Sequence, residues 1–121
     1  MIDPNIVERE ILDMGMDDYF GIYEIIWRIN TLWPEASIGD KYVVADTVLR
    51  RLLRVGHVSL VRELVSQPGR HVESLSESQH DELLREPTAW YPSALGEPPT
   101  TIAYLTNKTG EARYNELSTV A

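Results

Sequence analysis

The 121-residue chain contains no cysteine and no long apolar run. The absence of cysteine excludes a disulfide framework, a thiolate zinc site and a cysteine nucleophile. No apolar stretch approaches the roughly 18 residues that a membrane-spanning helix needs. The acidic N-terminus also lacks the basic segment with which a secretory signal begins. We therefore expect a cytoplasmic protein without a membrane partner.

The sequence also lacks the common catalytic and cofactor motifs. It has no dinucleotide-binding glycine fingerprint, phosphate-binding loop, serine nucleophile elbow or zinc-binding His-Glu-x-x-His motif. The histidines, His57, His71 and His80, show no metal-ligand spacing. His80 is followed by two acids on a predicted helix, where consecutive side chains point apart and cannot converge on one metal. We expect a non-enzymatic protein with no metal and no cofactor.

Charge is abundant but unevenly placed over what we expect to be a single domain, residues 1–121. The formal net charge is −8. Residues 1–24 hold seven acids and one base, residues 41–70 hold six bases and two acids, and residues 71–121 hold eight acids and three bases. An acidic protein disfavours nucleic acid and favours basic partners. The central bases could instead neutralise acidic neighbours within the fold.

The stretch from Ser37 to Arg62 organises the predicted fold. Ser37 begins a capping box, and two apolar stripes follow it along a helix that ends at Gly56. The stripes are Val44, Val48, Leu52, Val55 and Tyr42, Ala45, Leu49, Leu53. A helix that is apolar on two sides is packed on two sides, so we expect it in the core. The β-branched content of residues 57–62, with the glycine before them, predicts a strand directly after it.

The remaining segments predict an α+β fold of three to four helices with a small antiparallel hairpin or sheet. We expect a short helix at 5–14, although residues 1–16 could be a loosely attached arm. Periodicity predicts a helix at 17–32, with Phe20 and Trp27 at the border of its polar face. Further along the chain we expect a turn at 67–69, a helix to Arg85 that a capping box at Ser76–Gln79 begins, and a loop at 87–99. A second strand at 100–106 can pair antiparallel with the strand at 57–62. A turn at 107–110 and a closing helix or strand at 111–117, with Ala112 and Leu117 inward, complete the expected fold.

The helix ending in L-L-R-V-G, the strand V-S-L-V-R and the later strand ending in Y-L-T resemble the winged-helix arrangement. The resemblance covers about residues 19–62 and 100–117. The usual closing pattern places two residues between a threonine and a glycine, whereas three separate Thr106 from Gly110 here. The resemblance implies that the helix before the first strand could read DNA, as a transcriptional regulator does. Its contacts would then be Thr47, Arg50, Arg51 and Arg54.

A small, acidic, cysteine-free domain without catalytic motifs is also similar in profile to immunity proteins. These cytoplasmic proteins neutralise the toxins of polymorphic or contact-dependent growth inhibition systems. The resemblance implies a basic, possibly nuclease, toxin domain as the partner, attracted by an acidic surface. Two acidic surfaces are candidates, and an aromatic anchor ringed by acids would suit a binding hot spot. They comprise Asp13, Asp17, Asp18 and Glu24 with Phe20 and Trp27, and then Glu73, Glu77, Asp81 and Glu82.

Overall fold

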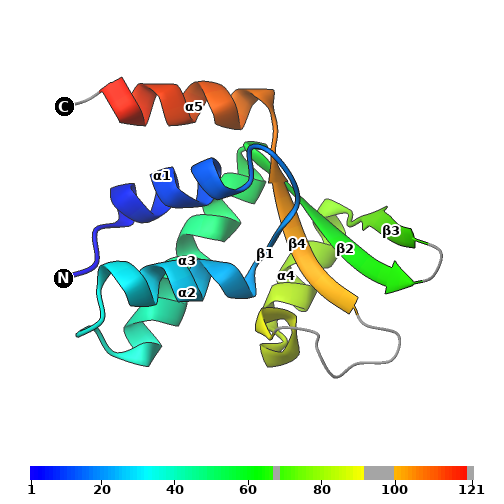
Figure 1. Ribbon diagram of the computed structural model, residues 1–121, viewed down its shortest axis with the longest axis horizontal. Coiled ribbons are helices and arrows are strands. Elements are labelled where there is room, and N and C mark those ends of the chain that lie inside the picture. The colour runs from blue at the N-terminus through cyan, green and yellow to red at the C-terminus, as the bar shows by residue number, and fades with distance from the viewer. Residues whose placement is uncertain (67–68, 92–99, 120–121) are drawn as a thin grey trace.

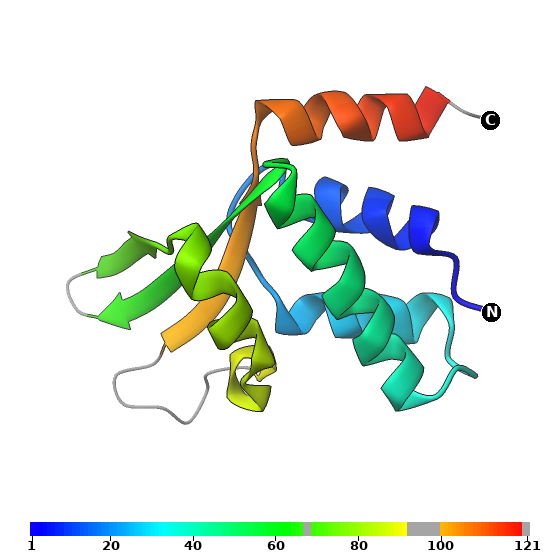
Figure 2. The same cartoon turned by 180° about the vertical axis from the view of Figure 1, so that it is seen from behind.

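The computed structural model describes residues 1–66, 69–91 and 100–119, excluding the side chains of 64–66, 69–71 and 100. The fold is α+β, with helices gathered at one end and on one side of an antiparallel sheet (Figures 1 and 2). The elements are α1 (Pro4–Met14), β1 (Phe20–Gly21), α2 (Tyr23–Leu32), α3 (Ile38–Arg54), β2 (Val58–Ser66), β3 (Gly69–Ser74), α4 (Glu77–Arg85), the 3-10 helix η1 (Pro87–Trp90), β4 (Thr100–Thr106) and α5 (Lys108–Thr119).

Local capping signals set the helix boundaries where the sequence predicted them. The Ser37 hydroxyl accepts a hydrogen bond from the Asp40 amide at 3.1 Å and begins α3. Gly56 follows the last residues of α3 with a φ of +82°. This backbone conformation costs glycine little. Ser76 and Gln79 form the predicted capping box of α4. These three predictions are confirmed.

The sheet has the order β1-β4-β2-β3 and is antiparallel throughout. Strand β2 pairs with β4 from Val58↔Thr106 to Leu64↔Thr100, so the predicted pairing of these distant strands is confirmed. The sequence prediction ended the first strand at Arg62, but β2 continues to Ser66. It also missed β3, which pairs with the end of β2. Residues 67 and 68 of the predicted turn lie outside the described residues.

The predicted helix at 17–32 begins only at Tyr23, which corrects the position of Phe20. Phe20 and Gly21 form β1 beside β4, and the Ile22 amide extends this pairing to the Ile102 carbonyl at 3.0 Å. A Cβ on Gly21 would lie 2.4 Å from Cε1 of Tyr23, so the packing there requires glycine. Sheet pairing with a strand far along the chain thus overrides the helical periodicity.

Helix α1 is an integral part of the core, as the helix alternative for residues 5–14 expected. Val7, Ile11 and Leu12 are buried, and α1 packs against both α3 and α5. The carboxylate of Glu8 is buried between Arg51 of α3, at 3.1 Å, and Arg113 of α5, at 2.9 Å. The hydrogen bond to Glu8 raises the pKa of the Arg113 guanidinium. One buried acid therefore joins three helices.

The predicted turn at 107–110 is instead the start of α5. The Asn107 side-chain oxygen accepts a hydrogen bond from the Gly110 amide at 3.1 Å, while its side-chain nitrogen donates to the Gly56 carbonyl. The closing segment is a helix, and Leu117 packs against the core as expected. Ala112 is exposed, which corrects its predicted inward position. In both views α5 runs beside α1 (Figures 1 and 2).

No helix within the described ranges is both long enough and apolar enough to cross a lipid bilayer.

Within the predicted loop at 87–99, the first four residues form η1. Trp90 is buried there, whereas Tyr91 is exposed. Residues 92–99 of that loop lie outside the described residues.

Candidate functional site: a groove between α3, α4 and η1

The two halves of α3 differ in what they bury. The C-terminal half buries Leu49, Leu52 and Leu53, as the apolar stripes predicted. The first two turns instead expose apolar side chains: the exposed fractions are 61% for Ile38 and 66% for Val43. Tyr42 and Val55, which the stripes placed inward, are also exposed, and this corrects the prediction for both.

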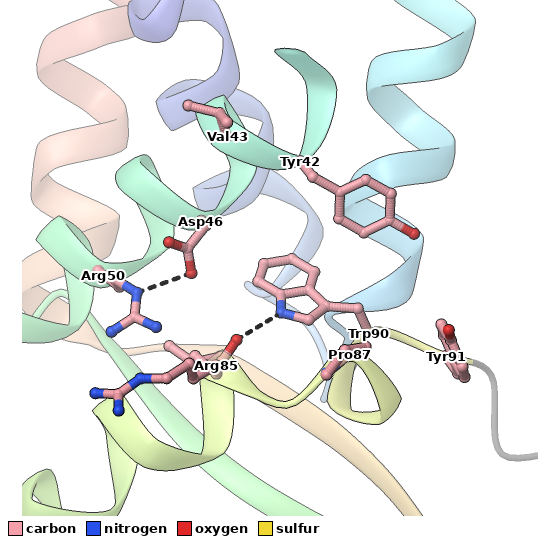
Figure 3. A pocket seen from close by; sticks show the side chains of 9 residues that line it. Tyr42, Val43, Asp46, Arg50, Arg85, Pro87, Trp90 and Tyr91 are labelled. Atoms are coloured by element: carbon pink, nitrogen blue, oxygen red, sulfur yellow. Dashed lines mark hydrogen bonds and ion pairs between the residues drawn. The ribbon is translucent and has the colours of Figure 1, made fainter. Parts of the chain in front are cut away.

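Two of these exposed side chains, Tyr42 and Val43, line a groove with a volume of about 540 Å³ (Figure 3). Helix α3 forms one wall, the end of α4 forms the other, and η1 forms the floor at one end. The volume falls within the roughly 300–1,000 Å³ of pockets that bind small molecules. The lining residues are Tyr42, Val43, Asp46, Arg50, Leu84, Arg85, Pro87, Trp90 and Tyr91.

Trp90 fixes the aromatic end of the groove. Its indole nitrogen donates a hydrogen bond to the Leu84 carbonyl at 3.0 Å, so the polar atom of this buried ring is satisfied. The Tyr42 ring meets the indole edge-on, with centroids 6.1 Å apart. Figure 3 places Pro87 beside Trp90 and Tyr91 farther along the chain. The groove therefore has a rigid aromatic base and a partly exposed aromatic rim.

The opposite end of the groove is charged. Arg50 lies between two carboxylates, with Nε 2.8 Å from Asp46 and Nη1 2.6 Å from Asp81 of α4. The second ion pair connects the two walls of the groove. Arg85 lines the same end and is exposed, with no ion-pair partner within the described part of the chain. The groove thus runs from an aromatic end to an ion-paired end.

Of the four residues that the DNA-reading hypothesis singled out, two are held in ion pairs and two are exposed. Arg50 is held by Asp46 and Asp81, and Arg51 is held by the buried Glu8. Thr47 and Arg54 are exposed on α3. Arg62 of the basic segment also pairs with an acid, Glu73, at 3.5 Å. For Arg50, Arg51 and Arg62 the prediction that central bases neutralise acidic neighbours is confirmed.

The predicted N-terminal acidic surface has an exposed aromatic side chain at only one of its two aromatic positions. Asp13, Asp17 and Asp18 are exposed near the α1–β1 connection, and Trp27 is 54% exposed on α2. Glu24, on α2 with Trp27, accepts a hydrogen bond from the Gly21 amide at 3.1 Å. Phe20 is half-buried, packs against the core and meets Tyr104 edge-on at 6.3 Å. Trp27 is therefore the exposed aromatic anchor that this surface offers.

One residue of the second predicted acidic surface, Asp81, reaches the groove through its ion pair with the lining residue Arg50. Glu77, Asp81 and Glu82 are exposed on α4, and Glu73 is exposed on β3. Figure 1 shows α4 behind the sheet, away from the α1–β1 connection, so the two acidic surfaces are separate. The groove is lined by aromatic residues that the sequence reasoning did not select as a site. The signal in the sequence was Val43, an aliphatic residue outside both predicted stripes.

The groove offers binding groups and no assembled catalytic set. His57 and His80 lie outside its lining, within hydrogen-bonding distance of Thr109 and of the Leu75 carbonyl respectively. The side chain of His71 lies outside the described residues. Over the described ranges, no cluster of three or more His, Asp or Glu side chains could hold a metal ion. Neither a protein-family model nor a curated relative matches the chain.

Proposed function

We propose that this protein is a non-enzymatic binding module that recognises another protein, as an immunity protein recognises a basic toxin. The observation that carries the proposal is the exposure of Ile38, Tyr42 and Val43 beside the aromatic groove. Contiguous apolar side chains on the surface of a folded domain are typical of partner sites, whereas single ones are ordinary surface. A concave site with a buried tryptophan at its base also has the anatomy of a binding hot spot.

The same residues weigh against DNA reading. A recognition helix presents hydrogen-bonding side chains to the base edges from its N-terminal turns. Here those turns expose Ile38, Tyr42 and Val43, with Asp40 as an added negative charge. Arg50 and Arg51 would have to leave their carboxylate partners to reach a phosphate. Breaking these ion pairs would cost much of the free energy that a new contact between arginine and phosphate provides.

A basic partner follows from charge. The chain carries a formal net charge of −8, which would steer a cationic protein toward it and raise the association rate. Asp81 of α4, whose side chain is 81% exposed, pairs with Arg50 of the groove, so one exposed acid lies beside the apolar contact surface. A nuclease toxin, which must itself bind nucleic acid, would have the required basic surface.

One observation favours the second candidate, a winged-helix transcriptional regulator. The helix pair α2–α3 is followed by the antiparallel strands β2 and β4, which supports the winged-helix resemblance. In that case the exposed Thr47 and Arg54 would remain accessible to DNA. A gel shift on genomic fragments at low salt tests this candidate. Salt-sensitive binding that Arg54→Glu abolishes would favour it over protein binding.

Gene neighbourhood and co-expression test the first candidate. We expect the gene to lie beside a large toxin gene. Co-production of this protein with the C-terminal domain of that toxin should restore growth and yield a stable complex on size-exclusion chromatography. A neighbourhood without a toxin gene, or a folded protein that neither binds nor protects, would contradict the proposal.

A further inference from the structure

We propose that the groove between α3, α4 and η1 binds a small organic acid, in which an aromatic ring is joined to one carboxylate. The ring lies at the aromatic end of the groove, and the carboxylate pairs with Arg85 at the charged end. The inference goes beyond the proposed function and does not depend on it, because the ligand is a small molecule and not a protein.

The groove has the dimensions of a small-molecule site. Its volume of about 540 Å³ lies well inside the roughly 300–1,000 Å³ of pockets that bind such ligands. The α3 wall runs from Tyr42 to Arg50, eight residues along the helix. At 1.5 Å per residue, this wall is about 12 Å long. A ring and a short chain that ends in a carboxylate can lie end to end along it.

The aromatic end of the groove selects a flat ring. Trp90 is buried at its base, and the Tyr42 ring meets the indole edge-on with centroids 6.1 Å apart. The indole nitrogen already donates to the Leu84 carbonyl, so this ring offers no further donor. A polar group buried there without a hydrogen bond would be costly. An aromatic ring would instead pack edge-on or offset against the others, which is favourable beyond the area that it buries.

The charged end of the groove contains one arginine whose charge is matched and one whose charge is not. Arg50 lies 2.8 Å from Asp46 and 2.6 Å from Asp81, so two carboxylates hold it. Arg85 is exposed and has no ion-pair partner among the residues that the structure describes. Figure 3 shows both guanidinium groups at the same end, away from the aromatic rings. Arg85 is therefore the lining group that can gain an ion pair from a ligand.

The acids next to Arg85 in the sequence belong to a different surface of α4. Glu82 and Glu86 line a separate pocket with Arg62 and Gln79, and neither of them lines the groove. The groove lining carries two arginines and one acid, and so a formal charge of +1. A cationic ligand would meet Arg85 and find in the lining only an acid that already pairs with an arginine. A negative group is the one that this lining complements.

A single carboxylate fits the site better than a phosphate does. The planar guanidinium group can donate two parallel hydrogen bonds to the two oxygens of a carboxylate. A phosphate ester would bring a second negative charge close to Asp46 and Asp81, without a second unmatched arginine in the lining. The formal net charge of −8 would add to that repulsion. The ligand class is therefore an aromatic monocarboxylate.

Matched small molecules test the inference on the full chain. The probes are naphthalene-2-acetate, 4-(naphthalen-2-yl)butyrate, the amide of each, and 2-(naphthalen-2-yl)ethylamine. Titrations followed by ¹⁵N–¹H NMR give the dissociation constants. At least one acid should bind in a saturable way and at least about tenfold more tightly than its own amide, because the amide cannot form the charged hydrogen bonds. Equal binding of acid and amide, tighter binding of the amine, or no saturable binding of either acid at millimolar concentration would overturn the inference.

The tryptophans report where the ligand binds. The chain has three, Trp27, Trp33 and Trp90, and each gives one indole N–H signal. Trp27→Phe and Trp33→Phe assign two of the signals, so the Trp90 signal is identified without a change in the groove. The acid should shift the signal of Trp90 and leave that of Trp27, which is exposed on α2, in place. A shift of Trp27 alone would place the ligand on α2 and refute the proposal.

Arg85→Gln tests the charged contact. Arg85 is exposed, so this variant should fold like the wild type, which its thermal unfolding checks. It should bind the acid at least about tenfold more weakly and bind the amide unchanged. Arg9→Gln makes the same substitution on α1, outside the groove lining, and should bind the acid as the wild type does. Equal affinity of the acid for Arg85→Gln and for the wild type would refute the role of Arg85.

The ligand and the protein partner can be tested apart. If the acid binds in the groove and no toxin domain binds, the ligand site stands and the immunity function fails. If a toxin domain binds and no acid does, the immunity function stands and the ligand site fails. If both bind, a saturating concentration of the acid should weaken the binding of the toxin domain, because the two would share the groove.

Discussion

The two halves of α3 have the same helical backbone and opposite environments. The C-terminal half buries three leucines and holds Arg50 and Arg51 in ion pairs with acids of α4, α1 and α3 itself. The N-terminal half leaves Ile38, Tyr42 and Val43 in contact with solvent. The half that carries the arginines is therefore committed to the fold, and the apolar half is free to contact a partner. The arrangement reverses what a DNA-reading helix would present.

The largest contrast in stability should come from truncating one residue in each half. Leu52→Ala removes a side chain that is 1% exposed and should lower the free energy of unfolding by about 2–5 kcal/mol. Val43→Ala, on the exposed half, should change it by no more than about 0.5 kcal/mol. Urea denaturation followed by circular dichroism measures both. Similar losses from both variants would refute the division of the helix.

The next effect concerns the acid that anchors the C-terminal half to the rest of the fold. Glu8→Ala leaves Arg51 and Arg113 without their shared partner, and both retain access to water. We expect a loss of about 1–3 kcal/mol in unfolding free energy. Asp13→Ala, an exposed acid on the same helix, is the control and should have little effect. If Glu8→Ala left the unfolding free energy unchanged, this ion-pair cluster would not hold α3 in place.

A smaller effect separates buried from exposed tyrosines at high pH. Burial, foremost, and the nearby Glu24 raise the pKa of Tyr104 well above its ordinary value, and its hydroxyl donates to the Ile11 carbonyl at 2.7 Å. A phenol whose pKa is higher in the folded state stabilises the fold fully below about pH 10. That contribution is lost as the pH rises above about 10. Unfolding free energy should fall in alkali, and the fall should be shallower in Tyr104→Phe.

At neutral pH, Tyr104→Phe should cost about 1 kcal/mol, because it removes one hydrogen bond at the end of α1. Tyr42→Phe removes a hydroxyl at the groove rim and should leave stability unchanged within about 0.5 kcal/mol. Equilibrium denaturation across the pH range measures the unfolding free energies of Tyr104→Phe, Tyr42→Phe and the wild type. An alkaline profile of Tyr104→Phe that matches the wild type would contradict the account of Tyr104.

The smallest effect on stability should accompany a change that removes binding. Val43→Asp replaces an exposed side chain, so unfolding free energy should stay within about 0.5 kcal/mol of the wild type. A larger loss, measured by urea denaturation, would mean that Val43 supports the fold and does not serve as a binding residue.

The sequence predicted features that depend on a few neighbouring residues. Ser37, Gly56 and the Ser76–Gln79 capping box set helix ends locally, and each was correctly placed. It failed at β1 and β3, because pairing with distant strands decides these short segments. Phe20 was misassigned for that reason. The groove could not be predicted at all, since α4 and η1 reach α3 only in the folded chain.

The most direct test uses the toxin domain that the proposed function expects to be encoded beside the gene. Isothermal titration calorimetry compares its affinity for Val43→Asp and for Thr47→Asp. The two variants add the same charge to the same helix, one turn apart, and differ only in whether the carboxylate enters the groove. We predict that Val43→Asp binds at least about tenfold more weakly than the wild type and that Thr47→Asp binds like it. Undiminished binding by Val43→Asp would contradict the assignment of the groove as the working surface of this protein.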